Sequence, residues 1–320
     1  MRQAGRYMAE YRAVREKLGF LELCHHPAAA ADVTVTAVQR LGVDAAIIFA
    51  DILLILEPLG VGLEFSSGDG PIIHRPIRSP DDVKRLARYD TADALSFVYE
   101  AIRLTRQGLA GRVPLIGFSG APFTLASYLI EGSGSRNYVD TKSFMYCHTS
   151  AWNDLLSLLS DLVNEYLKNQ VEAGAEAVQL FDSWVGCLSP DDYRTYVLPH
   201  SRTAIAGIGP KTPVIYFGTG TAGLLPAMRE AGSDVLGVDW RIDLDDAWAR
   251  IGHDLPVQGN LDPVTLFAPP GEIRRQAKAI LARAGGRPGH IFNLGHGILP
   301  KTPVDHVVAL VDAVHELSAR

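Results

Sequence analysis

The hydrophobic positions along the chain follow two alternating patterns. Short runs rich in valine, isoleucine and aromatic residues are separated by longer segments in which apolar residues recur every three to four positions. The short runs predict strands, and the longer segments predict amphipathic helices. The predicted strands are Ala45–Ala50, Val113–Phe118, Ala177–Phe181, Pro213–Phe217, Val235–Val238, Pro256–Gly259 and His290–Leu294. The predicted helices are Pro27–Leu41, Ala94–Leu109, Trp152–Ala173, Asp191–Ile208, Leu224–Ala231, Ile273–Ala284 and Pro303–Leu317.

The regular alternation of strand and helix is typical of βαβ units and therefore of a parallel sheet. The segment that begins at Met1 has the character of a loop that follows a further strand. We therefore expect an α/β protein, a single-domain (β/α)8 TIM barrel over residues 1–320, with its first strand truncated or missing before Met1. In such barrels the active site lies at the carboxyl ends of the strands.

Polar or flexible residues follow nearly every predicted strand. Reading just past the strands gives Asp51, Ser119-Gly120, Asp182-Ser183, Gly218-Thr219, Asp239, Asn260 and Gly295-His296-Gly297. Each position taken alone also fits ordinary turn chemistry. Taken together, they predict a barrel with a polar mouth.

The start of the chain is rich in arginine, with Arg2, Arg6, Arg12 and Arg15 close together. A guanidinium group is always charged and binds a carboxylate or phosphate with two parallel hydrogen bonds. Gly5 allows the backbone to bend or to approach a ligand closely. The pattern fits a clamp for a polyanionic substrate, but it also fits a solvated basic segment, and the segment alone does not decide between them.

Composition narrows the class of protein. A chain with 47% hydrophobic and 21% charged residues has the profile of a soluble globular protein. The formal net charge of −6 argues against general binding of nucleic acid, which needs a basic face. Cys24, Cys147 and Cys187 form no C-x-x-C pair, which suits a reducing compartment better than a disulfide framework or a zinc site. The most apolar run, residues 45–56, is too short to span a membrane. We expect a cytoplasmic protein.

The run Gly218-Thr219-Gly220-Thr221-Ala222-Gly223 matches the G-x-G-x-x-G fingerprint of dinucleotide-binding domains. It follows a predicted strand, and Asp239 ends the next one, so a nicotinamide-dependent oxidoreductase is an alternative. Two observations weaken this alternative. The fingerprint follows four predicted βα units instead of the first strand, and Pro226 falls close behind the helix start. We favour a glycine-lined loop at the barrel mouth.

Several motifs closely resemble those of the uroporphyrinogen decarboxylase family. They are MRQAGRY at Met1–Tyr7, FADIL at Phe49–Leu53, GFSGAPFTL at Gly117–Leu125 and NLGHGI at Asn293–Ile298. Gly237–Trp240 and Gln258–Pro263 fit the same family, so the resemblance extends over the whole chain. It implies a (β/α)8 barrel, usually a homodimer, that uses no cofactor and no metal. It also implies removal of CO2 from the four acetate side chains of uroporphyrinogen III, giving coproporphyrinogen III in haem biosynthesis.

The resemblance further implies roles for charged residues. Arg2, Arg6 and Arg15 match arginines that bind the substrate's carboxylates, and Asp51 matches the aspartate that accepts its pyrrole N–H groups. Protonation of a pyrrole carbon creates the electron sink for decarboxylation, and an anionic Asp51 stabilises the cation that develops. Arg2 is considered as the proton donor, although a guanidinium is a poor acid. A helix cap is the structural alternative for Asp51.

Five uncharged or weakly basic residues complete the predicted site. Tyr128, Ser183 and His296 match family positions that contact the substrate, whereas Phe118 and Phe181 are placed to pack on pyrrole faces. Each has a structural alternative. Tyr128 fits a helix residue that faces the core, Ser183 a turn hydroxyl and His296 a polar residue in a glycine turn. Both phenylalanines also fit the barrel core. The predicted catalytic residues are Asp51, Arg2, Arg6, Tyr128 and His296.

Zinc-dependent methyltransferases of corrinoid metabolism share the barrel and form a second alternative class. They use an H-x-C pair and a later cysteine as zinc ligands. This chain has no H-x-C pair, and its neighbouring Cys147 and His148 are expected in a helix or loop away from strand ends. A non-catalytic scaffold is a third alternative, but it has no need for arginines and an aspartate at strand ends.

Overall fold

The apolar runs form the strands of one parallel sheet, as predicted. The computed structural model describes residues 3–66, 70–209 and 211–319. Within them the sheet has seven strands in the order β1-β4-β5-β6-β7-β8-β9. The strands are β1 (Ala46–Ile47), β4 (Leu115–Gly120), β5 (Ala177–Asp182), β6 (Val214–Gly218), β7 (Val235–Gly237), β8 (Val257–Leu261) and β9 (His290–Leu294). The predictions agree to within a few residues, because most of these strands are largely buried and rich in apolar residues.

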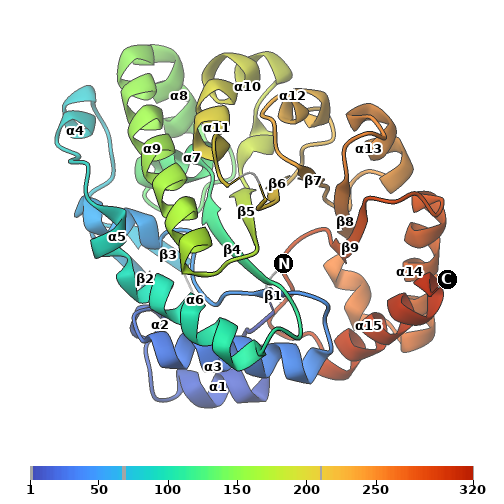
Figure 1. The fold of residues 1–320 in the computed structure, drawn as a ribbon. Coiled ribbons are helices and arrows are strands. Elements are labelled where there is room, and N and C mark those ends of the chain that lie inside the picture. Colours follow the sequence, from blue (N-terminus) through green and yellow to red (C-terminus); the bar gives the residue numbers. More distant parts are fainter. Residues whose placement is uncertain (1–2, 67–69, 210, 320) are drawn as a thin grey trace.

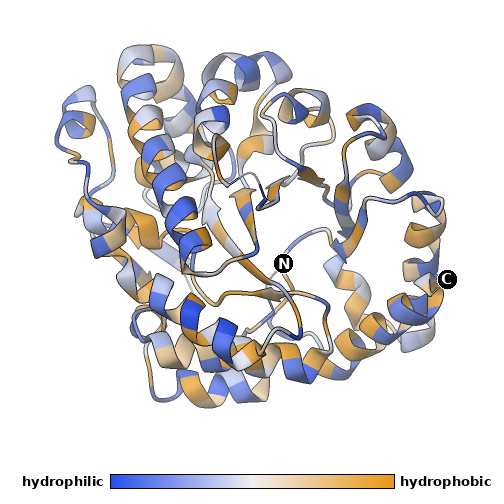
Figure 2. Ribbon diagram, viewed as in Figure 1, coloured by the Kyte–Doolittle hydropathy of each residue, from blue (hydrophilic) through white to orange (hydrophobic). Residues whose placement is uncertain are grey.

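Helices surround the sheet on its outer side (Figure 1). They are α1 (Ala9–Arg15), α2 (Phe20–Cys24), α3 (Pro27–Leu41), α4 (Pro80–Lys84), α5 (Thr91–Ala94), α6 (Ser96–Leu109), α7 (Pro122–Glu131), α8 (Val139–Cys147), α9 (Thr149–Ala173), α10 (Pro190–Tyr196), α11 (Leu198–Ile205), α12 (Leu225–Arg229), α13 (Leu244–Ile251), α14 (Pro270–Ala284) and α15 (Val304–Ser318). Short 3-10 helices are η1 (Leu54–Leu59), η2 (Val185–Cys187) and η3 (Pro263–Phe267). The strands are mostly hydrophobic, and hydrophilic residues gather on the outer sides of helices such as α6 and α9 (Figure 2).

The helical layer is continuous where the sheet ends. Strands β1 and β9 are the edges of the described sheet, yet α15 packs against both α14 and α3. Arg40 of α3 lies 3.3 Å from Asp305 of α15, which adds an ion pair to this contact. At the β1 edge, the Gln3 amide donates to the Ala45 carbonyl at 2.6 Å and accepts the Ile47 N–H at 3.0 Å. One side chain thus makes two hydrogen bonds that a neighbouring strand would make. The α/β TIM-barrel class is confirmed.

Some elements were not predicted correctly. The single helix expected over Asp191–Ile208 is divided into α10 and α11 at Val197, because Pro199 lacks an N–H group. Helix α7 was missed because nearly all of its residues are buried, so it shows no amphipathic period. The antiparallel hairpin of β2 (Leu63–Ser66) and β3 (Gly70–Ile73) was also missed, as were the short helices α1, α2, α4, α8 and α13.

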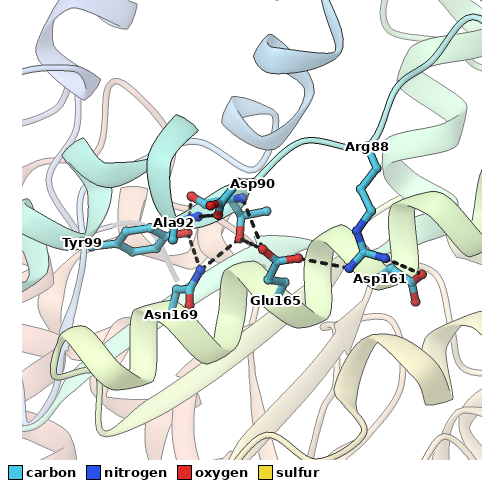
Figure 3. Close-up of polar contacts among 8 residues, drawn as sticks. Arg88, Asp90, Ala92, Tyr99, Asp161, Glu165 and Asn169 are labelled. Atoms are coloured by element: carbon cyan, nitrogen blue, oxygen red, sulfur yellow. Dashed lines mark hydrogen bonds and ion pairs between the residues drawn. The ribbon is translucent and has the colours of Figure 1, made fainter.

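A polar network joins α5 to the long helix α9 (Figure 3). Glu165 accepts the hydroxyl of Thr91 at 3.0 Å, and Asn169 donates to the same hydroxyl oxygen at 3.0 Å. Arg88 bridges Asp161 at 3.3 Å and Glu165 at 3.2 Å. These bonds satisfy polar groups at the start of α5 and hold this segment to the outer helical layer.

Candidate active site

Asp51 lies just beyond β1 and is half-buried. Its Oδ1 accepts the N–H of Leu53 at 2.9 Å, in a turn that leads into η1. Asp51 therefore makes one of the hydrogen bonds expected of a helix cap, which was the structural alternative to a catalytic role. The Asp51 carboxylate is also close enough to Tyr128 of α7 to raise the pKa of that phenol, second to the effect of burial. The structure thus brings these two predicted residues together.

Tyr128 extends from α7 toward the end of β5. Because burial and the Asp51 charge both raise its pKa, the phenol is protonated at neutral pH and can donate a hydrogen bond to a carboxylate. Its ring lies 3.8 Å from the Trp184 ring, centroid to centroid, with the two planes inclined by 30°. Trp184 follows the half-buried Ser183, so Tyr128 and Ser183 lie on the same side of the barrel mouth.

The two predicted phenylalanines form part of an aromatic row across three adjacent strands. The ring of Phe118 on β4 lies 5.6 Å from that of Phe181 on β5, which lies 6.0 Å from that of Phe217 on β6. Both contacts have edge-to-face geometry, in which the positive edge of one ring meets the negative face of another. Phe118 is buried, whereas Phe181 is only partly buried. The row is therefore compatible both with barrel core and with a surface for a flat apolar ring.

The predicted arginines differ in their surroundings. Arg2 lies outside the described residues. Arg6 is exposed in the turn before α1. Arg15 is half-buried: its Nη1 donates to the Leu18 carbonyl at 2.5 Å, and its guanidinium lies 5.6 Å from the Phe20 ring centroid. These contacts occupy part of the Arg15 guanidinium, so Arg6 is the more accessible cation of the two.

Arg15 and Asp51 both lie near the buried thiol of Cys24. Burial raises the pKa of the Cys24 thiol, the Asp51 charge raises it further, and the Arg15 charge opposes this rise. Both charges therefore act on one thiol. In addition, the Phe20 ring lies 6.0 Å from that of Phe49, which precedes Asp51 by two residues. An aspartate and an arginine predicted from separate motifs thus share one side of the site.

His296 lies on a different part of the mouth, in the loop after β9. It is exposed, and its ring lies 6.1 Å from the Trp240 ring in the loop after β7. Arg241 stacks on Trp240 at 3.8 Å and donates to buried Asp239 at 2.6 Å. Asn260 at the end of β8 donates to the Asp239 carbonyl at 3.0 Å. The loops after these three strands are therefore held together as one wall.

The glycine fingerprint has a structural role in this wall. Gly220 donates its N–H to Asp239 Oδ2 at 2.6 Å. In a dinucleotide site such an acidic residue accepts ribose hydroxyls, and the loop amides bind the pyrophosphate. Here the acid and an amide are bound to each other. The loop is thus a part of the barrel mouth, as we favoured.

Metal ligands do not gather in the part of the chain that the structure describes. No group of three or more His, Cys, Asp and Glu side chains there is arranged to hold a metal ion. Cys147 ends α8, and His148 caps it, which agrees with their predicted place away from strand ends. None of the described helices is both long enough and apolar enough to cross a membrane.

A cleft of about 340 Å³ lies beside the wall of the β7–β9 loops, against α14. Its lining includes Trp240 and Asn260 but none of the predicted site residues. Its cations are already paired within the protein, because Arg275 contacts Glu272 at 2.6 Å and Arg283 contacts Asp243 at 2.9 Å. These pairs leave the cleft little net positive charge for a polycarboxylate, so we do not place the substrate there.

Sequence reasoning missed several residues that shape the site. Trp184 packs on Tyr128, and Trp240 and Arg241 pack beside His296. Thr124 contacts Asp182 and the main chain of Trp184. Their positions in the sequence could have indicated them, because these residues lie beside or within the motifs recognised at strand ends.

Comparison with known proteins identifies the family. The family model described as uroporphyrinogen decarboxylase (URO-D) matches residues 1–317. A protein of Chloroflexus aurantiacus (strain J-10-fl) named uroporphyrinogen decarboxylase is 60% identical over 319 residues, covering 98% of this chain and 90% of that protein. A protein of the same name from Roseiflexus sp. (strain RS-1) is 54% identical over 325 residues, covering 100% of this chain and 93% of that protein.

Solved structures share the fold at low sequence identity. A methyltransferase from Methanosarcina mazei matches with a TM-score of 0.80 and 23% identity, covering 96% of this chain and 91% of that chain. A putative vitamin-B12 independent methionine synthase from Listeria monocytogenes matches with a TM-score of 0.64 and 12% identity, covering 97% and 94%. At these identities the likeness supports the barrel and carries no statement about activity.

Proposed function

This chain belongs to the uroporphyrinogen decarboxylase family, and from that premise we propose that it converts uroporphyrinogen III to coproporphyrinogen III. It is an enzyme of porphyrin biosynthesis that acts as a carboxy-lyase. The proposed reaction releases CO2 from each of the four acetate side chains. The observation that carries the proposal is the position of Asp51 at the end of β1, within electrostatic reach of the protonated Tyr128.

We propose that the electrons released with CO2 enter the substrate's own pyrrole ring. Protonation of the ring carbon next to the acetate makes the pyrrole cationic. Asp51, as a half-buried anion, accepts the pyrrole N–H groups and stabilises this charge as it develops. The bond between the acetate methylene and its carboxylate then breaks, and its electrons neutralise the ring and leave an exocyclic methylene. A proton added to this methylene, with loss of the proton from the ring carbon, gives the methyl group of the product. No cofactor is needed in this scheme. Arg2 is proposed as the proton donor or relay.

We propose that the remaining predicted residues bind and orient the substrate. Arg2, Arg6 and Arg15 bind its carboxylates, because guanidinium groups form paired hydrogen bonds with carboxylates. Tyr128, Ser183 and His296 donate further hydrogen bonds, and the pyrrole rings pack on Phe118 and Phe181. We further propose that the protein acts as one domain over residues 1–320, is a homodimer and is cytoplasmic. Light scattering is expected to give twice the chain mass of 34.7 kDa.

The function is tested by anaerobic incubation with uroporphyrinogen III. The products are then oxidised to porphyrins and separated by chromatography with fluorescence detection. We expect porphyrins with seven to four carboxylates to accumulate, at the same rate with and without a metal chelator. Loss of activity with the chelator would contradict a metal-free reaction. Absence of conversion, together with a higher melting temperature in NAD(P), would favour the oxidoreductase instead.

Replacing Arg6 with methionine is expected to raise KM by about 10–100-fold with a smaller change in kcat, because one charge-assisted contact to a substrate carboxylate is lost. The measurement is initial rate against uroporphyrinogen concentration at low and high salt. Arg103→Met is the matched control, because Arg103 is also exposed but pairs with Glu100 at 3.1 Å on the outer helix α6. Equal KM values for the Arg6 variant and the wild type would contradict the role.

A further inference from the structure

Asp182 is a buried acid that the proposed reaction does not use. It is the last residue of β5 and has 0% exposure. Its Oδ1 accepts the Thr124 hydroxyl at 2.7 Å, and its Oδ2 accepts the Tyr216 hydroxyl at 2.7 Å. Burial raises its pKa to about 6, although both hydroxyl bonds oppose the rise. An acid in this state is half ionised in the range where enzymes work.

The contacts of Asp182 continue to the predicted active site. Thr124 gives its hydroxyl proton to Asp182, so its oxygen is free to accept the main-chain N–H of Trp184 at 3.3 Å. The Trp184 ring packs against the Tyr128 ring at 3.8 Å. Thr124 and Tyr128 are four residues apart on α7 and therefore lie on the same side of that helix. Asp182 is thus linked to Tyr128 both through Trp184 and through α7.

We propose that Asp182 is a positioning residue whose carboxylate holds Trp184 and Tyr128 in the geometry that the substrate requires, and that its protonation weakens this hold. The inference rests on the proposed function and deepens it. An ionised carboxylate accepts both hydroxyls at once. A protonated one must donate its own proton to one of them, so that hydroxyl must find another acceptor. For Tyr216 such acceptors exist, because Tyr193 and Ser201 each lie 3.2 Å from its oxygen. The proton is therefore expected on the Tyr216 side, and the Thr124 hydroxyl is left with an uncharged carbonyl oxygen, which is a weaker acceptor than a carboxylate.

The two phenols and the thiol near Asp182 all have a raised pKa and stay protonated near pH 6. Tyr216 of β6 and Tyr193 of α10 have their pKa raised by burial. Burial also raises the pKa of Cys187 in η2, to about 11, with Lys142 of α8 opposing the rise. The charge of Arg202 on α11 opposes the rise in the pKa of Tyr193. A transition near pH 6 in this region is therefore assigned to Asp182.

The expected pH dependence has opposite signs for activity and for stability. The pKa of folded Asp182 lies above its ordinary value of 3.8, so the folded state binds more protons than the unfolded state between these values. Its contribution to stability is therefore present below pH 4 and is lost as the pH rises to about 6. Activity is expected to rise over the same window, because the ionised form holds Trp184. If Asp182 only stabilised the fold, activity would not rise with pH over the same range in which stability falls.

The test is the pH profile of kcat for the wild type, Asp182→Asn and Tyr193→Phe. For the wild type we expect kcat to fall about tenfold per pH unit below pH 6. For Asp182→Asn we expect kcat at pH 7.5 to be lower by about 10–100-fold, with a smaller change in KM. We also expect this variant to lose the fall of kcat below pH 6, which is called the acid limb of the pH profile. Tyr193→Phe loses only the distal hydroxyl, and we expect it to keep the limb and the wild-type kcat to within about twofold.

A second variant and a second signal keep the inference testable if Asp182→Asn does not fold. Thr124→Val removes the link to Trp184 and is expected to lower kcat as Asp182→Asn does, whereas Thr124→Ser retains the hydroxyl and is expected to restore it. The fluorescence of Trp184, taken against Trp184→Phe, is expected to change with a midpoint near pH 6. An unchanged pH limb in Asp182→Asn, or wild-type kcat in Thr124→Val, would overturn the inference. A wild type inactive at every pH would instead sink the proposed function, and the fluorescence change would then test the inference alone.

Discussion

Replacing Asp51 with asparagine is expected to lower kcat by about 10²–10³-fold while the fold is retained, because a fixed charge that stabilises the transition state is removed. In the proposed reaction protonation makes the pyrrole cationic before CO2 leaves, so the attraction to Asp51 is stronger along the path to the transition state than in the neutral ground state. Such differential binding lowers kcat when it is lost. Asparagine keeps a side-chain oxygen that can accept the Leu53 N–H, now at 2.9 Å from Asp51 Oδ1, so the turn is retained.

The measurement for Asp51→Asn is single-turnover decarboxylation of uroporphyrinogen III, with circular dichroism and thermal unfolding to verify the fold. Asp262→Asn is a closely matched control. Asp262 is half-buried just past β8, and its Oδ1 accepts the N–H two residues later, on Val264, at 2.9 Å. The two substitutions thus remove equal charges from similar turns at different strand ends. Near-normal turnover in Asp51→Asn, or an equal loss in both variants, would contradict the role of Asp51.

Replacing Gln170 with leucine is expected to lower the free energy of unfolding by about 2–5 kcal/mol, because two buried backbone groups lose their partners. Gln170 on α9 has 0% exposure. Its Oε1 accepts the Phe118 N–H at 2.8 Å, and its Nε2 donates to the Phe118 carbonyl at 2.9 Å. Leucine has a similar volume but can make neither bond. Because Phe118 belongs to the aromatic row, KM for the substrate is also expected to rise.

The loss is measured by urea unfolding, from the transition midpoint and its slope. Gln107→Leu is the control, because Gln107 is exposed on α6 and a surface change of this kind costs at most about 0.5 kcal/mol. A change of that small size in Gln170→Leu would show that the Phe118 backbone groups find other partners. Gly117→Ala is an independent check, because a Cβ at Gly117 would lie too close to the Gln170 oxygen.

Strands such as β6 and β7 are predictable because every residue in them is buried, so that they form short, almost entirely apolar runs. The surest helix, α9, is predictable because one side faces the core and the other faces water. Helix α7 has no such signal, since almost every residue of it is buried. The break between α10 and α11 is hidden in the sequence, because Pro199 stands within an otherwise periodic segment.

The strand-helix alternation, the family resemblance and the residue types at the strand ends can be read from the chain alone. These are properties of local patterns and motifs, which need no knowledge of distant contacts. The pairs of residues that meet at the strand ends are known from the folded chain. Asp182 and Thr124 are 58 positions apart, yet they share a hydrogen bond because β5 ends beside the start of α7. Asp239 is bound to Gly220 because adjacent strands bring their loops together. Such pairings depend on parallel strands ending at one edge of the sheet, and no local pattern encodes that geometry.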